Sequence, residues 1–208
     1  MNIGITQRVD DIPSYGERRD SLDQRWTQLI IELGHLPVPL PNVSAKCARE
    51  MIDQFEIDAL ILSGGNTIAS LETGATDVAP ERDQLENTLI DIALNRKLPL
   101  LGVCRGMQML NLYFDGQLYK TTGHVATRHG LNVQSSKYSL PAEVNSFHNY
   151  AIAREGLGQP LQALAYDDEE NVEAFCHAQL PLLAIMWHPE RELPFAEVDI
   201  QLIKKLIE

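Results

Sequence analysis

The sequence has little of what marks a disulfide-rich, metal-binding or cofactor-binding protein. Only three cysteines occur in 208 residues, Cys47, Cys104 and Cys176, and no two of them have C-x-x-C spacing. This pattern argues against a disulfide framework and a cysteine zinc site, and it favours a reducing, cytoplasmic location. The histidines show no ligand spacing either. We therefore predict no metal and no organic cofactor.

Positive charge and long apolar runs are also scarce. The 17 lysines and arginines are outnumbered by 29 acidic residues, which gives a formal net charge of −12. Such a chain, with no basic cluster, is repelled by nucleic acids and anionic membranes, so we expect neither partner. No apolar run reaches the roughly 18 residues that cross a bilayer, and the N-terminus does not have the pattern of a signal peptide. The expected partner is a small molecule, and whether the chain forms a homo-oligomer stays open.

The pattern that is present predicts one α/β domain over residues 1–208. Apolar β-branched runs alternate with amphipathic stretches in the first half, and a helix at about 21–33 is expected to start at Ser21 and end at Gly34. The other expected helices lie at about 44–54, from Pro80 to before Pro99, from Cys104 to about 114, and from about 195. Expected strands lie at about 2–6, 36–40, 59–62, 100–103, 131–134, 161–166, 172–176 and 182–187, with a turn at 167–171. We predict a mostly parallel central sheet flanked by helices, with a small additional antiparallel region.

One turn in this pattern is typical of a nucleophile. Gly102-Val103-Cys104-Arg105-Gly106 fits G-x-nucleophile-x-G, in which a sharp strand-to-helix turn exposes the central side chain. The start of a helix also favours the thiolate of Cys104, and the N–H of Arg105 would face a developing oxyanion. The alternative is a buried, inert cysteine, and the pentapeptide alone does not decide between them. Cys47 and Cys176 lack such a turn, and we interpret both as structural.

A base and its orienting acid are expected at the end of a neighbouring strand. The apolar run 182–187 leads into His188-Pro189-Glu190, and residues two apart in an extended segment project to the same side. Parallel α/β sheets place ligands at the carboxyl ends of strands, where Cys104 and His188 are both predicted to lie. We interpret His188 as the base and Glu190 as its orienting group. An exposed histidine and glutamate in a loop is the alternative.

A second glycine turn follows another apolar strand. In Ser63-Gly64-Gly65-Asn66 the two glycines allow a backbone N–H, that of Gly65, to turn toward the nucleophile as a second oxyanion donor. The alternative is a plain tight turn without a catalytic role.

Together, Gly64-Gly65, the run from Gly102 to Gln108, and His188-Pro189-Glu190 resemble the class I glutamine amidotransferase-like family. The similarity extends over nearly the whole chain. It implies a flavodoxin-like three-layer fold and a Cys-His-Glu triad. It also implies attack on a glutamine-type γ-carbonyl, through a γ-glutamyl thioester that water hydrolyses.

Within this family the chain is similar to the γ-glutamyl hydrolases. Cys-Arg-Gly at the nucleophile, Pro80-Glu81-Arg82-Asp83 with Glu86, and the segment 145–149 carry that likeness. It implies that Gln108 and the backbone around Ser146, Phe147 and His148 hold the glutamyl group. His148-Asn149-Tyr150 departs from the His-His-Gln often found there, which leaves the contacts to the leaving group undefined.

The short chain and its opening, Gly4-Ile5-Thr6-Gln7-Arg8, resemble hydrolases of γ-glutamyl-CDP-amidate in capsule phosphoramidate synthesis. Because arginine binds phosphate well, Arg8 at the end of the first strand is the main candidate contact. We expect further basic side chains in loops bordering the pocket, with ordinary solvated charges as the alternative; they are Arg18, Arg19, His124, Arg128 and His129.

Other functions remain open at this point. One is hydrolysis of γ-glutamyl-γ-aminobutyrate, and another is a glutaminase subunit that passes ammonia to a partner synthetase. A third is a non-catalytic redox sensor that uses Cys104 as a reactive thiol. The presence of His188 and Glu190 counts against the sensor, because a sensor thiol needs neither.

Overall fold

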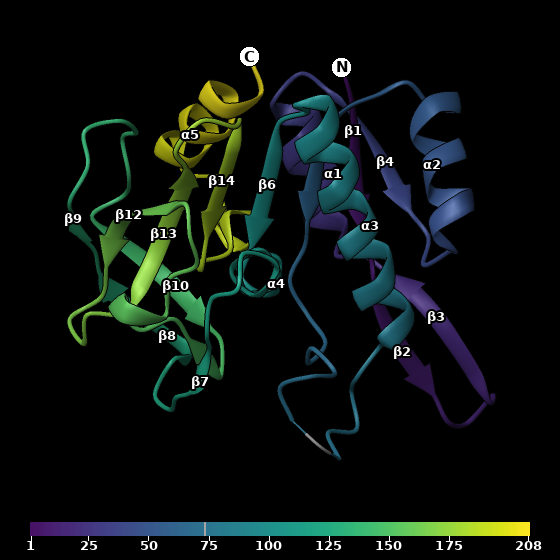
Figure 1. Ribbon diagram of the computed structural model, residues 1–208, viewed down its shortest axis with the longest axis horizontal. Helices are drawn as coiled ribbons and strands as arrows, with labels where there is room; N and C mark the ends of the chain where they lie inside the picture. The colour runs from purple at the N-terminus through teal and green to yellow at the C-terminus, as the bar shows by residue number, and fades with distance from the viewer. Residues whose placement is uncertain (73) are drawn as a thin grey trace.

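A central eight-stranded sheet organises the computed structural model, which describes residues 1–72 and 74–208 (Figure 1). The strand order is β4-β1-β5-β6-β14-β13-β12-β9. Neighbours from β4 to β14 are parallel, and the remaining pairs are antiparallel. The strands are β1 Asn2–Thr6, β4 Leu36–Leu40, β5 Ile57–Leu62, β6 Leu100–Val103, β9 Asn132–Val133, β12 Leu161–Tyr166, β13 Val172–His177 and β14 Leu182–Ile185. This architecture confirms the predicted α/β fold.

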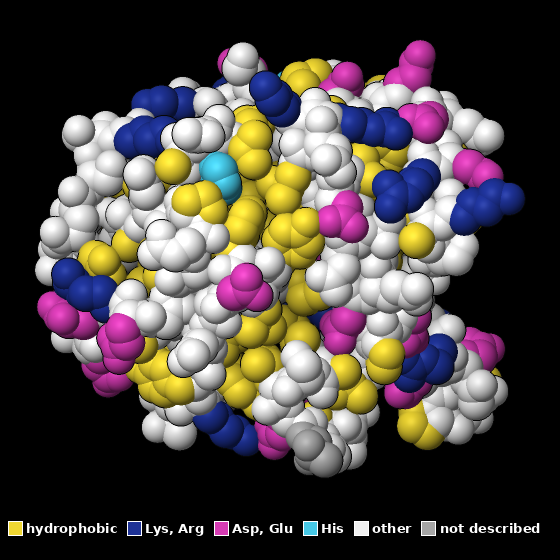
Figure 2. All heavy atoms as spheres, in the orientation of Figure 1, with side chains coloured by type: hydrophobic (Ala, Val, Ile, Leu, Met, Phe, Trp, Pro, Cys, Tyr) yellow, Lys and Arg dark blue, Asp and Glu magenta, His cyan; other side chains and the backbone are white. Residues whose placement is uncertain are grey.

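Helices cover both faces of the sheet and make three layers. One apolar cluster joins the sheet to α1 (Gln24–Glu32) and α5 (Glu197–Ile207), and a second joins it to α2 (Ala45–Gln54), α3 (Pro80–Arg96) and α4 (Arg105–Tyr113). Helices α3 and α4 lie in front of the sheet in Figure 1. On that face apolar side chains gather across the middle, and charged ones lie mostly toward the rim (Figure 2). Burial of each large apolar side chain contributes about 1.5–3 kcal/mol, which favours this layering.

The N-terminal part differs from the prediction. Helix α1 begins at Gln24, and its cap is Asp23, which accepts a hydrogen bond from the N–H of Arg25 at 3.0 Å. Ser21, the predicted cap, ends a strand instead, because β2 (Arg8–Ile12) and β3 (Glu17–Ser21) form a hairpin. This hairpin projects beyond the sheet at the lower right of Figure 1. It is rich in charge and has no alternating apolar face, so periodicity could not reveal it.

The predicted antiparallel region is confirmed, and it is larger than expected. Strand β8 (Val125–Gly130) pairs with β10 (Glu143–Phe147), and β7 (Tyr119–Lys120) pairs with β11 (Tyr150–Ala151). The strands predicted at 131–134 and 182–187 shorten to β9 and β14. The predicted turn at 167–171 is present. No helix in the described part of the chain has both the length and the apolar character of a membrane span.

Several basic residues predicted in loops lie in these strands. Arg8 begins β2, Arg18 and Arg19 belong to β3, and Arg128 and His129 belong to β8. The prediction was wrong because the strands that hold them are polar and lie outside the central sheet. His124 does lie outside a strand, directly before β8.

A buried ion network joins two helices to the turn after β5. Glu86 of α3 pairs with Arg82 at 2.9 Å and with Arg105 of α4, and all three side chains are at most 2% exposed. Arg105 also pairs with Asp83. Burial opposes ionisation of Glu86, but Arg105 and Arg82 more than offset it and lower the pKa of the carboxyl. Both guanidinium groups are buried, so the Glu86 carboxylate between them has to compensate their charge.

We predict that Glu86→Ala lowers the free energy of unfolding by about 3–5 kcal/mol, because it leaves two buried guanidinium groups without their shared partner. Urea unfolding measures this, with Glu50→Ala as the control. Glu50 pairs with Lys46 at 3.9 Å on the surface, and its loss should change stability by about 0.5 kcal/mol or less. Since the pKa of Glu86 is lowered, its contribution is present above the ordinary carboxyl pKa and disappears as the pH falls through the lowered value. Equal effects of the two substitutions would contradict the assigned role.

Candidate active site

Cys104 lies at a sharp turn between β6 and α4. Its backbone has φ 52° and ψ −105°, a conformation that residues other than glycine rarely adopt. The Cys104 N–H donates to the carbonyl of Ile185 in β14 at 2.8 Å. The side chain is 6% exposed at the first turn of the helix. The strand-turn-helix geometry predicted from the sequence is therefore present.

Two glycines let the helix pass this close to the sheet. A Cβ atom on Gly106 would lie 2.1 Å from the carbonyl oxygen of Leu62, and one on Gly102 would lie 2.5 Å from Leu110 Cδ1. The first contact is with backbone and cannot be relieved by a side-chain rotation. The small residues on either side of Cys104 are thus required by packing.

His188 follows β14, the strand that pairs with β6, so its side chain emerges beside Cys104. Its Nδ1 lies 2.7 Å from Glu190 Oε1. The contact forms differently from the prediction, because residues Pro189–Arg191 make a 3-10 turn, η2, instead of an extended segment. Pro189 stands at the first turn position, where its fixed φ suits a helical start, and the turn brings the carboxylate back to the imidazole.

The glycine turn brings the thiol and the imidazole to one place. A Cβ atom on Gly64 would lie 2.7 Å from His188 Cε1 and 3.6 Å from Cys104 Cβ. Both side chains therefore border the same small space above Gly64. Only a residue without a side chain fits at that position.

The environment of His188 favours its protonated form. Burial by itself lowers the pKa of the imidazole, but the neighbouring Cys104 and the Glu190 carboxylate outweigh burial and raise it to about 9. Near neutral pH the imidazole therefore carries a proton beside the sulfur. That arrangement suits a thiolate–imidazolium pair.

Asn145 fixes the backbone of His188. The N–H of His188 donates to Asn145 Oδ1 at 2.9 Å, and Asn145 Nδ2 donates to the His188 carbonyl at 2.8 Å. The Phe147 ring stands edge-on to the imidazole, with centroids 5.8 Å apart. No spacing in the sequence reveals these two hydrogen bonds, because Asn145 in β10 and His188 after β14 come together only in the folded chain.

Arg82 fixes the glycine turn in a similar way. Its guanidinium donates to the carbonyls of Ser63, Gly64 and Gly65, at 2.7, 3.1 and 2.6 Å. Gly65 has φ +88°, which favours glycine. A peptide group is planar, so its N–H points away from its carbonyl. By holding the Ser63 and Gly64 carbonyls, Arg82 therefore also fixes the directions of the Gly64 and Gly65 N–H groups. In the sequence Arg82 stood out only as part of a resemblance, and its position in α3 gave no sign of this contact.

Two cavities adjoin at Gly65. One is lined by Cys104, Arg105, Gln108, Phe147, His148 and Tyr150, among others. The second is lined by His188, Glu190, Gly65 and two arginines, Arg8 and Arg191. We refer to the two cavities together as the groove; Cys104 lines its first half and His188 its second.

The predicted substrate contacts divide between this groove and the interior. Gln108, Phe147 and His148 line the first cavity, and Gln108 Nε2 donates to the Tyr150 carbonyl at 3.2 Å. Ser146 lines neither cavity, because its buried hydroxyl donates to the His124 carbonyl at 3.0 Å. Of this segment, Phe147 and His148 are therefore the residues that remain available to a substrate.

Of the six basic side chains expected from the sequence to border the pocket as phosphate contacts, only Arg8 lines either cavity. It lies against Gly65 and pairs with Asp10 at 3.1 Å. Others are held by carboxylates: Arg18 by Asp11 and Glu81, Arg19 by Glu17, and Arg128 by Glu143 and Glu192. Arg191, which no sequence pattern singled out, lines the second cavity and stacks on Phe147, with its guanidinium carbon 4.1 Å from the ring centroid. Its place directly after Glu190 was the only available signal.

Comparisons with known proteins identify the family and support the fold. Residues 2–190 match the Peptidase C26 family. The gamma-glutamyl-CDP-amidate hydrolase of Campylobacter jejuni is 35% identical, over 96% of this chain and 95% of that protein. A component of the glutamine-hydrolysing GMP synthase of Methanocaldococcus jannaschii is 28% identical over 73% of each chain. The crystal structure of a glutamine amidotransferase from Thermotoga maritima has a TM-score of 0.68 at 16% identity, covering 98% of this chain and 82% of that one.

The match to the family covers most of the chain, and the match to the Campylobacter jejuni protein covers nearly all of it. The protein therefore belongs to the peptidase C26 family of class I glutamine amidotransferase-like proteins, and it is a hydrolase that acts on carbon–nitrogen bonds.

Proposed function

We propose that this enzyme hydrolyses a γ-glutamyl amide bond, with Cys104 as nucleophile, His188 as acid and base, and Glu190 as the group that orients His188. The observation that carries the proposal is the convergence of thiol, imidazole and glycine turn around Gly64. A nucleophile beside a base, and a base held by an acid, is the arrangement that acyl transfer requires.

In the first step the Cys104 sulfur attacks the γ-carbonyl carbon of the substrate. The negative charge that forms on the carbonyl oxygen faces the N–H groups of Gly65 and Arg105. The contact of Arg82 with the Gly64 carbonyl and the start of α4 hold these two groups in place. The proton on His188 passes to the leaving nitrogen as the C–N bond breaks. A γ-glutamyl thioester remains on the enzyme, and the amine or amidate departs.

In the second step His188, now neutral, removes a proton from water. The resulting hydroxide attacks the thioester carbon, the C–S bond breaks, and glutamate is released. Glu190 stabilises the imidazolium in both steps through its contact with Nδ1. Gln108, Phe147 and His148 line the first cavity, which supports the proposal that the Gln108 side chain and the Phe147–His148 backbone hold the glutamyl group.

The most specific substrate we propose is γ-glutamyl-CDP-amidate, cleaved to glutamate and cytidine diphosphoramidate in capsule synthesis. The relative from Campylobacter jejuni carries the name of this activity. In addition, the second cavity, on the His188 side, holds Arg8 and Arg191, and arginine binds phosphate oxygens in pairs. An anionic leaving group on this side would therefore meet two guanidinium groups. Arg8 is paired with Asp10 and Arg191 lies near Glu190, so the leaving group would share them with carboxylates.

A glutaminase that delivers ammonia to a partner synthetase is the second candidate. The similarity to a component of GMP synthase supports it. It requires a partner and acts on glutamine, whose leaving group is ammonia. A γ-glutamyl-γ-aminobutyrate hydrolase is a further variant, but its leaving group has no phosphate for the two arginines.

A panel of leaving groups tests these functions. We expect the isolated protein to release glutamate faster from γ-glutamyl-CDP-amidate than from glutamine or γ-glutamyl-γ-aminobutyrate. Cys104→Ala should lower this rate by roughly 10³-fold or more, because the thioester cannot form. Cys47→Ala, on α2, is the matched control and should retain the rate. Glutamate release by the Cys104 variant at the wild-type rate would exclude this nucleophile.

The pH dependence of kcat/KM tests the roles of His188 and Glu190. Because the pKa of His188 is raised to about 9, the proton needed by the leaving group is present below that value. We expect kcat/KM to fall as the pH rises through about 9. Glu190→Gln removes one of the groups that raise the pKa, so the alkaline fall should begin at a lower pH. An unchanged alkaline limb in that variant would contradict the orienting role.

Arg8→Gln tests recognition of the leaving group. We expect KM for γ-glutamyl-CDP-amidate to rise about 10-fold, the loss of one charge-assisted hydrogen bond to phosphate, while KM for glutamine stays the same. Arg49→Gln, exposed on α2, is the control for a general loss of positive charge. An equal rise for both substrates would argue against a phosphate contact at Arg8.

A further inference from the structure

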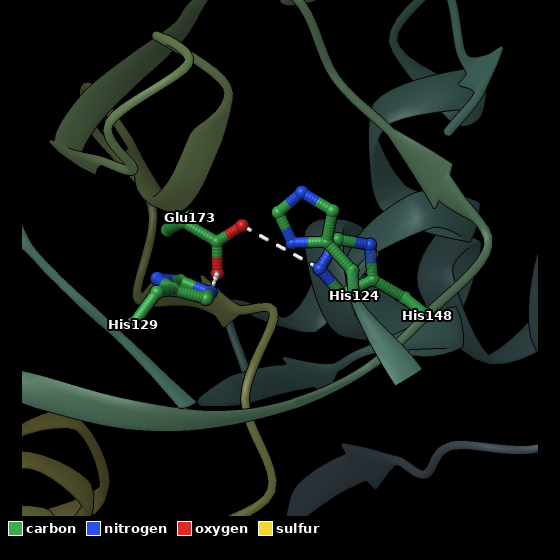
Figure 3. A group of neighbouring side chains, drawn as sticks. All are labelled: His124, His129, His148 and Glu173. Carbon is green, nitrogen blue, oxygen red and sulfur yellow. Dashed lines mark ion pairs between the residues drawn. The ribbon is translucent and has the colours of Figure 1, made fainter. Parts of the chain in front are cut away.

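Four ionisable side chains converge behind the first cavity: His124, His129, His148 and Glu173 (Figure 3). Each offers one ligand atom, and these atoms all lie within 4.8 Å of one another. The residues come from three segments that are distant in the sequence. His124 precedes β8 and His129 lies in it, His148 follows β10, and Glu173 belongs to β13 of the central sheet.

Among the residues that the structure describes, none makes a hydrogen bond to the Glu173 carboxylate. Its side chain is 1% exposed. Oε2 lies 3.6 Å from His129 Nε2, and Oε1 lies 3.6 Å from His148 Nε2. These distances are too long for N–H···O hydrogen bonds. A buried carboxylate without a partner is unfavourable, so the cluster is incomplete as it stands.

Two of the three histidines, His129 and His148, point their lone pairs at this carboxylate. His148 Nδ1 lies 3.0 Å from the Tyr150 carbonyl, and His129 Nδ1 lies 3.1 Å from the Gly130 carbonyl. Since a carbonyl only accepts, each Nδ1 carries the proton in a neutral ring, and each Nε2 presents a lone pair toward Glu173. Histidines that bind metals typically donate their other N–H to a carbonyl in this way.

We propose that His124, His129, His148 and Glu173 bind a divalent transition-metal cation, and that zinc fits the set best. Metal–donor distances of about 2.0–2.2 Å place neighbouring donors of a tetrahedral zinc site about 3.3–3.6 Å apart, close to the 3.6 Å pairs found here. Three imidazoles and one carboxylate suit zinc better than magnesium or calcium, which prefer oxygen. Four protein ligands make a closed site with no position left for catalysis.

A protonated Glu173 is the competing arrangement. Burial and the nearby Asp167 and Cys104 raise the pKa of this carboxyl, so a proton is the other way to remove its charge. One proton, however, allows only one Glu173 oxygen to donate a hydrogen bond, either to His129 or to His148, and leaves the other oxygen and the other imidazole without one. It also leaves His124 outside the contact, although its ring is tilted against that of His148 with centroids 4.7 Å apart. A cation among the four donor atoms, which lie within 4.8 Å of one another, would have all four groups around it.

The bound metal would tie the β8–β10 pair to the central sheet. His148 lines the cavity that contains Cys104, so the same tie would hold one wall of the proposed glutamyl pocket. The carbonyl of Glu173 accepts a hydrogen bond from Met186, two residues before His188, at 2.8 Å. The proposed metal site therefore lies beside the segment that leads to His188, and its role would be to hold this part of the structure in place.

The test uses untagged protein with Cys104→Ala, so that the nucleophile cannot bind the metal. The protein is treated with a chelator, dialysed and titrated with zinc, and metal content and thermal unfolding are measured. We expect about one zinc per chain and a Tm increase on the order of 10 °C when free zinc is about a thousand times Kd. Tetrahedral Co²⁺ should give visible absorption bands when it replaces zinc.

Variants in the same background locate the site. Glu173→Gln and His129→Ala should lose the bound zinc and the Tm increase, whereas His35→Ala, which removes a histidine outside the cluster, should keep both. Absence of zinc binding and of any Tm change in the parent protein would overturn the proposal and favour protonated Glu173. Zinc binding that persists in both cluster variants would overturn it as well. None of these readouts depends on the substrate, so failure here is distinct from failure of the proposed function.

Discussion

The backbone of Cys104 is held in a conformation that its side chain disfavours, and the geometry of the site depends on this constraint. A positive φ at a residue with a Cβ costs on the order of 1–3 kcal/mol, so the surroundings must supply it. They do so through the hydrogen bond from Cys104 to Ile185 and through the close approach of α4 to β5 that Gly106 permits. The strained turn keeps the sulfur at the start of the helix and beside the strand that leads to His188.

The groups around this turn are held by partners from other elements. Arg82 fixes the carbonyls of the glycine turn, and Asn145 fixes both backbone groups of His188. Arg82 in turn depends on Glu86, which it shares with Arg105 directly after the cysteine. Because these contacts are buried, they hold the proposed oxyanion donors and the imidazole in place before substrate arrives, which is how electrostatic stabilisation becomes effective.

Charged side chains line both halves of the groove. The cavity on the Cys104 side has Asp77 and the buried Arg105 among amide, aromatic and histidine groups. The cavity on the His188 side has Arg8 and Arg191 together with Asp23 and Glu190. The two guanidinium groups on the His188 side are the ones available to the proposed anionic leaving group, in a chain whose net charge is −12.

The sequence by itself determined the fold class, the turn around Cys104 and the approach of His188 to it. Apolar runs and glycine spacing are local properties, and parallel strands deliver their ends to one edge. Only the tertiary structure decided which polar groups meet across the fold: Asn145 with His188, Arg82 with the glycine turn, and His129 and His148 with Glu173. It also showed that β2 and β3 form a hairpin, and that most of the singled-out arginines are already paired. The physical reason is that polar partners in these contacts are chosen by packing between elements distant in the chain, and no sequence period records that choice.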